Sequence, residues 1–220
     1  MLPQIVKRTF FTCTQPLMAC SALAYYLFRA PRRGAQYVQL GPGRSNYLPG
    51  WINVDANIVT GKVDVWADLR LPLPFHSQTI DAFYSHHVIE HLPNLQAHLR
   101  DVFRCLKPGG VYRLGGPNGD SAFQMFVAGC KEWFTDFPDK RRSIGGKLDN
   151  FIFCRNEHLV ILTYSYLTEL LEDAGFVSVE RYLPTRTTGF PEIFAPCLER
   201  EWESDFVVPH TLILEARKPA

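Results

Sequence analysis

Four residues whose side chains could transfer protons or bind ligands lie close together in the chain: His86, His87, Glu90 and His91. A histidine with an unperturbed pKa of about 6.5 can accept a proton from a hydroxyl group near neutral pH, so His86 and His87 are candidate general bases. The same run contains the pattern H-x-x-E-H, which in one class of zinc peptidases supplies metal ligands from a long helix. Pro93 and the strand expected before the motif leave room for barely one helical turn, so we expect no metal here.

A glycine-rich turn and two acids follow three short apolar segments. Residues 37–40 have strand character and run directly into Gly41-Pro42-Gly43, where the chain needs the conformational freedom of glycine. Two further apolar segments end at Asp55 and at Asp68. Ligands of open α/β sheets bind at the carboxyl edge of the strands, so the turn and both carboxylates are candidates for one binding site.

The chain alternates short strand patterns with helical patterns. Apolar residues repeat at helical spacing between Leu95 and Leu106, and Lys107-Pro108-Gly109-Gly110 is expected to end that helix. A strand, a helix and a strand in succession indicate parallel pairing, which predicts an α/β protein. The predicted strands span residues 37–40, 51–54, 63–67, 81–86, 111–114, 176–182 and 211–216, and the predicted helices 92–106 and 166–174.

Two connections between these strands are too short for a crossover helix. Only residues 42–50 separate the first two strands, whereas a parallel crossover usually takes a dozen or more residues. Part of the sheet would be uncovered unless another element packs on it. The segment 10–28 carries no charge and is available for this purpose. We expect a helix within residues 1–35 that docks on the core through Leu17, Leu23, Ala24 and Leu27.

The same segment also has the outline of a membrane anchor. Its flanking basic residues are Lys7, Arg8, Arg29, Arg32 and Arg33. Its strongly apolar part runs only from residue 17 to residue 28, however, and a spanning helix needs about 20 apolar residues. We therefore favour the docked helix over membrane contact.

Composition narrows the classes of partner and compartment. A chain of 220 residues with 46% hydrophobic residues is long enough for one α/β core. Its 23 basic and 22 acidic residues nearly balance, which gives no support for a nucleic-acid partner. The six cysteines include no C-x-x-C pair and are expected to be reduced and structural, which favours a cytoplasmic location. The oligomeric state is left open.

Taken in order, the motifs resemble those of the class I S-adenosylmethionine (SAM)-dependent methyltransferases. The resemblance rests on Gln39-Leu40-Gly41-Pro42-Gly43, Asp55, Asp68, and the runs 80–82, 88–92 and 106–110. It implies SAM as cofactor and a Rossmann-like three-layer sandwich, with a mostly parallel seven-stranded sheet and an antiparallel last strand. Within the class, residues 47–55 resemble a bacterial branch often found alongside glycan and cell-envelope biosynthesis.

The resemblance also implies roles for individual residues. Gly41 and Gly43 would let the backbone approach the methionine part of SAM, although Gln39 replaces the usual acid of this motif. Asp55 would bond both ribose hydroxyls, since a carboxylate can accept two hydrogen bonds at once. Asp68 would contact the adenine amino group. The implied cofactor-binding residues are Gln39, Gly41, Gly43, Asp55, Asp68, Leu69 and Ser85.

Acceptor binding is assigned less fully. Residues 120–158 are irregular in pattern and are expected to form a lid-like insertion over the site. His158 resembles a position that often faces the acceptor, with a packing role as the alternative. Glu90 and His91 either fix the strand-to-helix junction or contribute to the site. The candidate acceptor-binding residues are Glu90, Asn118 and His158.

The leading interpretation is methyl transfer to a small-molecule or sugar-containing acceptor, at oxygen. The alternative is a catalytically weak SAM-binding or scaffold protein of the same fold, which the replacement by Gln39 supports. A nicotinamide-dependent oxidoreductase would need a helix N-terminus and a third glycine after the turn, and Ser45 stands where that glycine is common.

Overall fold

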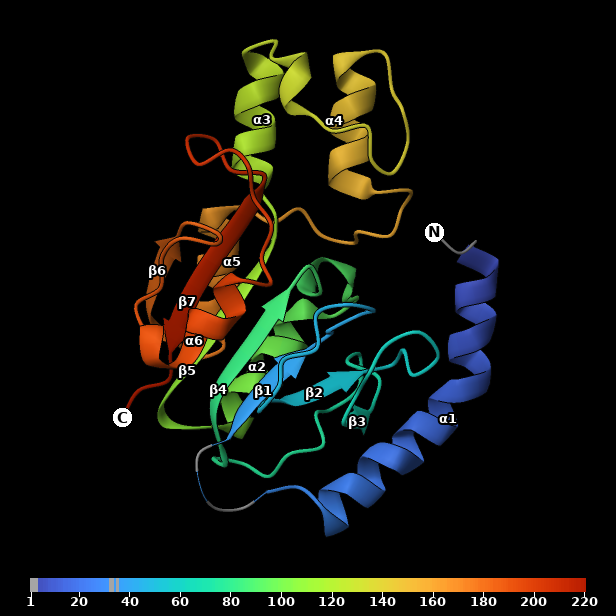
Figure 1. Cartoon of the computed structure of the whole chain (residues 1–220), viewed down its shortest axis with the longest axis vertical. Helices are drawn as coiled ribbons and strands as arrows, with labels where there is room; N and C mark the ends of the chain where they lie inside the picture. The colour runs from blue at the N-terminus through green and yellow to red at the C-terminus, as the bar shows by residue number, and fades with distance from the viewer. Residues whose placement is uncertain (1–3, 32–33, 35) are drawn as a thin grey trace.

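A computed structural model describes residues 4–31, 34 and 36–220 of the chain. Seven strands form one sheet in the order β3-β2-β1-β4-β5-β7-β6 (Figure 1). The strands are β1 (Tyr37–Leu40), β2 (Ile52–Asp55), β3 (Val65–Trp66), β4 (Ile80–His86), β5 (Leu106–Pro117), β6 (Val177–Tyr182) and β7 (Thr211–Arg217). Pairing is parallel from β3 through β5, and β7 runs antiparallel to both of its neighbours. The predicted Rossmann-like sheet is therefore confirmed.

Strand register brings the candidate site residues to one edge of the sheet. Leu40 pairs with Val54 on one side and with Ser85 on the other. The turn at Gly41, the acid Asp55 and the histidines after β4 therefore begin side by side at the carboxyl edge. The helix predicted over residues 92–106 is α2 (Leu95–Cys105), which ends within one residue of the predicted position, whereas β5 begins at Leu106 and so includes residues 107–110, which were expected to precede it.

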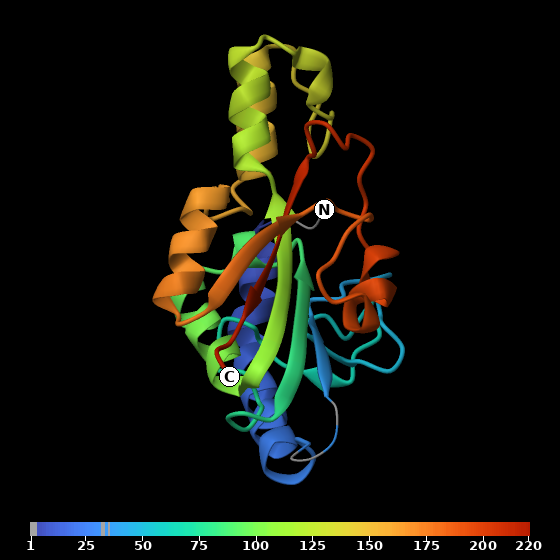
Figure 2. The same cartoon turned by 90° about the vertical axis from the view of Figure 1, so that its left-hand side faces the viewer.

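The two faces of the sheet are covered unequally (Figure 2). On one face, α2 and α5 (Tyr164–Asp173) bury the larger apolar core. The other face is covered by the β1–β2 loop, through Leu48 and Trp51, and by α6 (Pro191–Leu198). The β1–β2 connection contains no helix, as its length predicts. Sequence periodicity did not reveal α6, which is only eight residues long and contains two prolines.

The N-terminal helix α1 (Gln4–Phe28) lies along β3 at the edge of the sheet (Figure 1). Met18 is fully buried, and Ala22 and Tyr25 pack against the main core. These residues are spaced four and seven apart, so they share one helix face. The expectation of which residues dock was wrong, because the opposite face is the exposed one and carries Leu17, Leu23, Ala24 and Leu27.

No helix among the described residues is long and apolar enough to cross a membrane. Of the basic residues flanking the apolar segment, Arg32 and Arg33 lie outside the described residues. The six cysteines, all within the described part of the chain, form no disulfide, and three of them, Cys105, Cys154 and Cys197, are buried as structural cysteines would be.

The segment expected to be an irregular insertion is largely helical. It contains α3 (Gly119–Val127), the short helix η2 (Lys131–Trp133) and α4 (Ile144–Phe153). Helices α3 and α4 stand side by side beyond the carboxyl ends of the strands (Figure 1). They share a small apolar cluster of their own, built on Ala122, Phe134 and Ile152.

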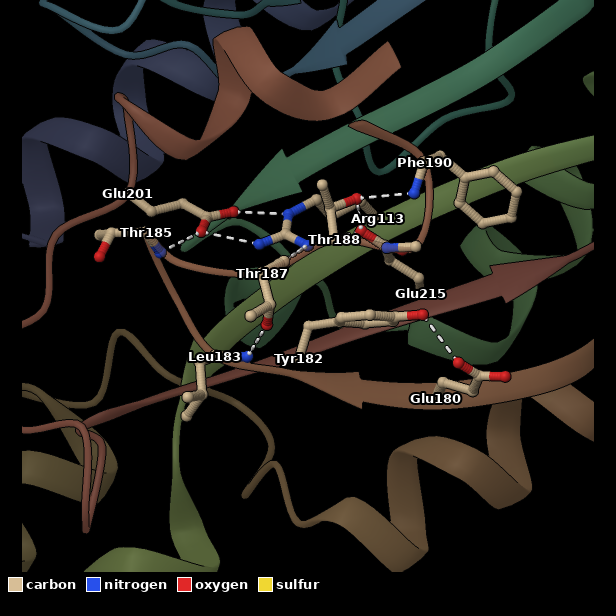
Figure 3. Close-up of polar contacts among 11 residues, drawn as sticks. Arg113, Glu180, Tyr182, Leu183, Thr185, Thr187, Thr188, Phe190, Glu201 and Glu215 are labelled. Carbon is tan, nitrogen blue, oxygen red and sulfur yellow. Dashed lines mark hydrogen bonds and ion pairs between the residues drawn. The ribbon is translucent and has the colours of Figure 1, made fainter. Parts of the chain in front are cut away.

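A buried ion-pair network joins the chain after β6 to the sheet (Figure 3). Arg113 of β5 is fully buried and donates two hydrogen bonds to Glu201, at 2.7 and 2.8 Å. It also donates to Glu215 of β7 at 2.6 Å and to the carbonyl of Thr187 at 3.1 Å. A guanidinium has five donors in a fixed plane, so Arg113 can hold both carboxylates at once.

Candidate functional site

The turn after β1 is held in the shape that its glycines allow. Gly41 and Gly43 have positive φ angles of 68° and 60°. Gly43 donates its backbone N–H to Asp55 at 2.8 Å, and the other oxygen of Asp55 accepts from the backbone of Asn57 at 2.9 Å. A Cβ on Gly41 would lie 2.4 Å from Val88 Cγ2, whereas no atom lies within 4 Å of a Cβ position on Gly43. The space beside Gly41 is therefore filled by the Val88 side chain, whereas the space beside Gly43 is empty.

Buried amides hold the rest of this loop. The Gln39 side chain is buried, and its oxygen accepts the backbone N–H of Leu48 at 3.1 Å. Asn53 of β2 accepts from the same N–H at 2.9 Å and donates to the carbonyls of Leu48 and Trp51. Asn53 is not among the residues that the sequence motifs indicated, although a polar residue between two apolar positions of a short strand is a signal that could have indicated it.

Asp68 lies at the carboxyl end of β3 and is buried. Arg70 holds both of its oxygens, with contacts of 2.8 and 2.7 Å, and Gln15 of α1 donates to it at 3.1 Å. Burial alone would raise the pKa of Asp68, but the hydrogen bonds and charge of Arg70 outweigh burial and lower this pKa. Helix α1 thus reaches the acid for which the resemblance implies adenine contact, and the Phe11 ring lies 3.9 Å from the Arg70 guanidinium.

A cavity of about 410 Å³ opens beside this acid. It lies between the segment after β3 and helix α2, with Leu69 and Arg70 on one side and Leu92 and Ala97 on the other. His98 lines it as well and binds the carbonyl of Leu69 through Nδ1 at 3.2 Å. The backbone after Asp68 is therefore fixed from the α2 side.

The histidine cluster is organised around a buried carboxylate. Glu90 lies on η1 (Ile89–His91), a single turn as expected, and is 1% exposed. His87, at a positive φ of 55°, places its Nδ1 3.1 Å from Glu90 Oε1. Burial by itself would raise the pKa of Glu90, but the hydrogen bond and charge of His87 outweigh it and lower this pKa. Glu90 is therefore an anion that orients the half-exposed His87 ring.

His86 differs from its neighbour in environment. Its Nε2 is buried and has no hydrogen-bond partner among the described residues. Burial, with His87 and Arg113 nearby, lowers the pKa of His86 well below its usual value. His86 is thus a neutral imidazole at neutral pH, and its ring centre lies 4.5 Å from that of His87.

The structure brings His158 to this cluster from the far end of the insertion. Its ring centre lies 5.0 Å from that of His91, and its Nδ1 is bonded to the carbonyl of Ile152 at 2.9 Å. The adjacent Leu159 donates its backbone N–H to the carbonyl of Glu90 at 2.7 Å. The sequence offered no distance between these residues, because their approach depends on how the insertion folds.

Two other candidates have side chains engaged in packing. Ser85 Oγ is fully buried and lies 2.8 Å from the hydroxyl of Tyr112 inside the sheet core. Asn118 caps α3 by accepting from Ser121 and donates to Ser121 Oγ and to the carbonyl of Pro209. Both lie at the carboxyl edge; Ser85 contacts another side chain of the core, and Asn118 holds backbone at the start of α3 and before β7.

Comparison with known proteins agrees with this architecture. Residues 54–114 match the family profile described as a methyltransferase domain. No curated protein matches the sequence. A SAM-dependent methyltransferase structure from Thermotoga maritima covers 97% of this chain and 95% of its own, with 16% identity and a TM-score of 0.50. Another, from Archaeoglobus fulgidus, covers 95% of this chain and 99% of its own, with 16% identity and a TM-score of 0.52.

A third structure contains the donor itself. Haemonchus contortus phosphoethanolamine N-methyltransferase 2, in complex with SAM, covers 97% of this chain and 60% of its own, with 14% identity and a TM-score of 0.53. At these identities the solved structures establish the fold, and the profile match is confined to residues 54–114. None of these matches tests the resemblance to a glycan-related branch.

Proposed function

We propose that the chain is a class I SAM-dependent methyltransferase and that it transfers the methyl group of SAM to a hydroxyl oxygen of a small-molecule or sugar-containing acceptor; the methyltransferase-domain profile over residues 54–114 and the shared fold support this. The observation that carries the choice of oxygen is the hydrogen-bonded pair of His87 and Glu90 at the end of β4. A hydroxyl group must lose its proton as its oxygen attacks, so oxygen methylation benefits from a positioned base.

The geometry of the first loop fits the donor. The space beside Gly43 is open, and Asp55 presents a carboxylate next to that space at the same edge. A carboxylate can accept hydrogen bonds from both hydroxyls of a ribose, while the glycine backbone can lie close to a bulky ligand. SAM supplies an electrophilic methyl group on a sulfonium, so the protein has to align the acceptor oxygen with it at about 3 Å.

Of the two histidines at the end of β4, His87 is the one suited to act as the general base. His87 is half-exposed and held by the Glu90 carboxylate, which can stabilise the imidazolium formed when His87 accepts the acceptor's proton. In the transfer, the oxygen–carbon bond forms, the carbon–sulfur bond breaks, and S-adenosylhomocysteine leaves. The neutral His86 packs beside the His87 ring, and its Nε2 is buried, so His87 is the histidine accessible to the acceptor.

The α3–α4 insertion supplies a surface for the rest of the acceptor. A hollow of about 280 Å³ beside these helices is lined mainly by apolar residues, including Phe123, Phe153 and Ile161, together with Asp149. Phe123 and Phe153 are each more than 40% exposed. Exposed aromatic faces can pack on the apolar face of a sugar or on an aromatic ring. This supports a lid role for residues 120–158.

Donor binding is tested by calorimetric titration with S-adenosylhomocysteine. Asp55→Asn keeps the size of the side chain but loses its charge and one acceptor, so we expect binding to weaken about 10- to 100-fold. Asp81→Asn is the matched control, because Asp81 binds Lys107 at the opposite edge of the sheet, at the start of β4. Equal affinity in both variants would contradict the donor site.

The atom that receives the methyl group is tested separately. The protein is incubated with ¹³C-methyl-labelled SAM and a panel of sugars, sugar nucleotides, phenols and amines, and the products are examined by ¹³C NMR. A methyl resonance on oxygen supports the proposal, and His87→Gln should then lower kcat more than it changes donor affinity. A methyl group on nitrogen or carbon would overturn it.

The scaffold interpretation remains the second candidate because Gln39 uses its side chain to hold the loop at Leu48. It predicts tight S-adenosylhomocysteine binding with no transfer to any acceptor of the panel.

A further inference from the structure

We propose that Glu90, His91 and His158 form a binding site for a divalent transition-metal ion of the zinc type. One potential ligand atom from each residue lies within 4.8 Å of the other two. Two imidazoles and one carboxylate suit such an ion, and three protein ligands leave a coordination position for another molecule. The expectation from the H-x-x-E-H motif was different, since that pattern relied on His87 and a long helix.

The spacing of these atoms fits a common ion. Ligands about 2.0–2.2 Å from a zinc ion lie about 3.3–3.6 Å from one another. His91 Nε2 is 3.9 Å from Glu90 Oε1. This separation is therefore slightly longer than that of bound ligands, so the side chains would have to move closer together to coordinate one ion.

Both histidines are already oriented by backbone carbonyls. His91 Nδ1 lies 2.9 Å from the carbonyl oxygen of Glu157, and His158 Nδ1 lies 2.9 Å from that of Ile152. A carbonyl can only accept, so each Nδ1 carries the hydrogen and each Nε2 carries the lone pair. Metal-binding histidines in proteins typically donate their second ring nitrogen in this way.

The carboxylate provides an independent indication of a ligand. Glu90 is 1% exposed, its Oε1 is bonded to His87, and its Oε2 has no hydrogen-bond partner among the described residues. A buried anionic oxygen without a partner is costly, because burial removes its hydration and nothing replaces it. A cation bound beside the carboxylate would compensate for part of this lost hydration, with Oε1, which also contacts His87, facing His91.

The location gives the ion a role that rests on the proposed function. The site lies at the end of β4, and the His91 side chain is 41% exposed, which leaves an approach from solvent. A hydroxyl that coordinates a divalent ion loses its proton more easily, and the ion also fixes the position of the oxygen. The acceptor would then bind through this hydroxyl, with His87 accepting the released proton.

The site itself is tested by titrating the full-length, chelator-treated protein with Zn²⁺ in a calorimeter. We expect one ion per chain, and a loss of affinity of about 100-fold or more in Glu90→Gln and in His158→Ala. His76→Ala is the matched control, because His76 precedes β4 at the opposite edge of the sheet and packs on Tyr26. It should bind Zn²⁺ like the wild type.

Two further measurements keep the result interpretable. His91→Ala changes a partly exposed side chain and should fold normally, so its far-ultraviolet circular dichroism should be unchanged while Zn²⁺ binding is lost. S-adenosylhomocysteine is titrated into the same preparations, which separates failure of the donor site from failure of the metal site. A wild-type protein that binds S-adenosylhomocysteine but no Zn²⁺ would overturn the proposal, as would equal Zn²⁺ binding in all variants.

Discussion

Replacing Arg113 by methionine should destabilise the protein strongly without touching the donor loop. Arg113 is fully buried and makes three hydrogen bonds to the carboxylates of Glu201 and Glu215. Methionine fills a similar volume but leaves two buried carboxylates without their cation. Removing one partner of a buried ion pair typically costs about 3–5 kcal/mol, most of it for the charge left behind.

Although Arg113 pairs with two carboxylates, we expect the destabilisation typical of one broken buried ion pair and not of two. Glu201 keeps a hydrogen bond from the backbone of Thr185, and Glu215 keeps those of Thr188 Oγ1 and of the Gly189 backbone. Each carboxylate therefore retains part of its solvation. For a chain of this size, 1 kcal/mol corresponds to a shift in melting temperature of about 2–4 °C. The expected decrease is about 6–20 °C.

The assay is thermal and urea unfolding followed by circular dichroism. Arg142→Met, at an exposed arginine of the insertion, is the control and should unfold like the wild type. Adding Glu201→Gln and Glu215→Gln to Arg113→Met removes the stranded charges and should recover a large part of the loss. A decrease below about 2 °C for Arg113→Met, or a further decrease on adding the two glutamine substitutions, would refute this reasoning.

Two other predictions concern the first loop and the residue that precedes β7. Gly41→Ala places a Cβ 2.4 Å from Val88 Cγ2 at a φ of 68°. Urea unfolding should therefore show a decrease of about 1–3 kcal/mol in the free energy of unfolding, and calorimetry should show a weaker affinity for S-adenosylhomocysteine. Unchanged values in both measurements would be inconsistent with the packing described. His210 is bonded to Glu203 and to a backbone carbonyl. Burial alone would lower the pKa of His210, but these hydrogen bonds outweigh burial and raise the pKa above 6.5. The stabilising effect of protonated His210 is therefore complete below about pH 6.5 and declines as pH rises through the folded-state pKa. The difference in unfolding free energy between wild type and His210→Gln should therefore shrink between pH 6 and pH 8, and a constant or growing difference would argue against the protonated pair.

Sequence patterns predicted the sheet well because each strand is marked by both its apolar residues and its ending. Residues 37–40 match β1, and the acids after the next two patterns lie at the carboxyl edge as expected. Connection length was equally informative, since too few residues between β1 and β2 excluded a crossover helix. These features are local, so neighbouring residues carry the information.

Helix α1 shows where local information fails. Both of its faces are largely apolar, so hydrophobic spacing alone did not distinguish the buried stripe of Met18, Ala22 and Tyr25 from the exposed stripe of Leu17 and Leu27. Its orientation is selected by contacts with other elements, such as the hydrogen bond from Gln15 to Asp68. Such contacts join residues far apart in the chain, and no periodicity reports them.

The candidate site combines both situations. The motif around Glu90 was visible in the sequence, and its single turn followed from Pro93. The approach of His158 was not, because it depends on α4 ending at Phe153 and on three successive residues with positive φ that turn the chain back: Cys154, Arg155 and Asn156. None of these three is glycine, and a left-handed backbone at other residues is not apparent from sequence. The same turn sets the carbonyl of Ile152 against His158 Nδ1, so the backbone strain at this position orients the ring that the proposed metal site requires.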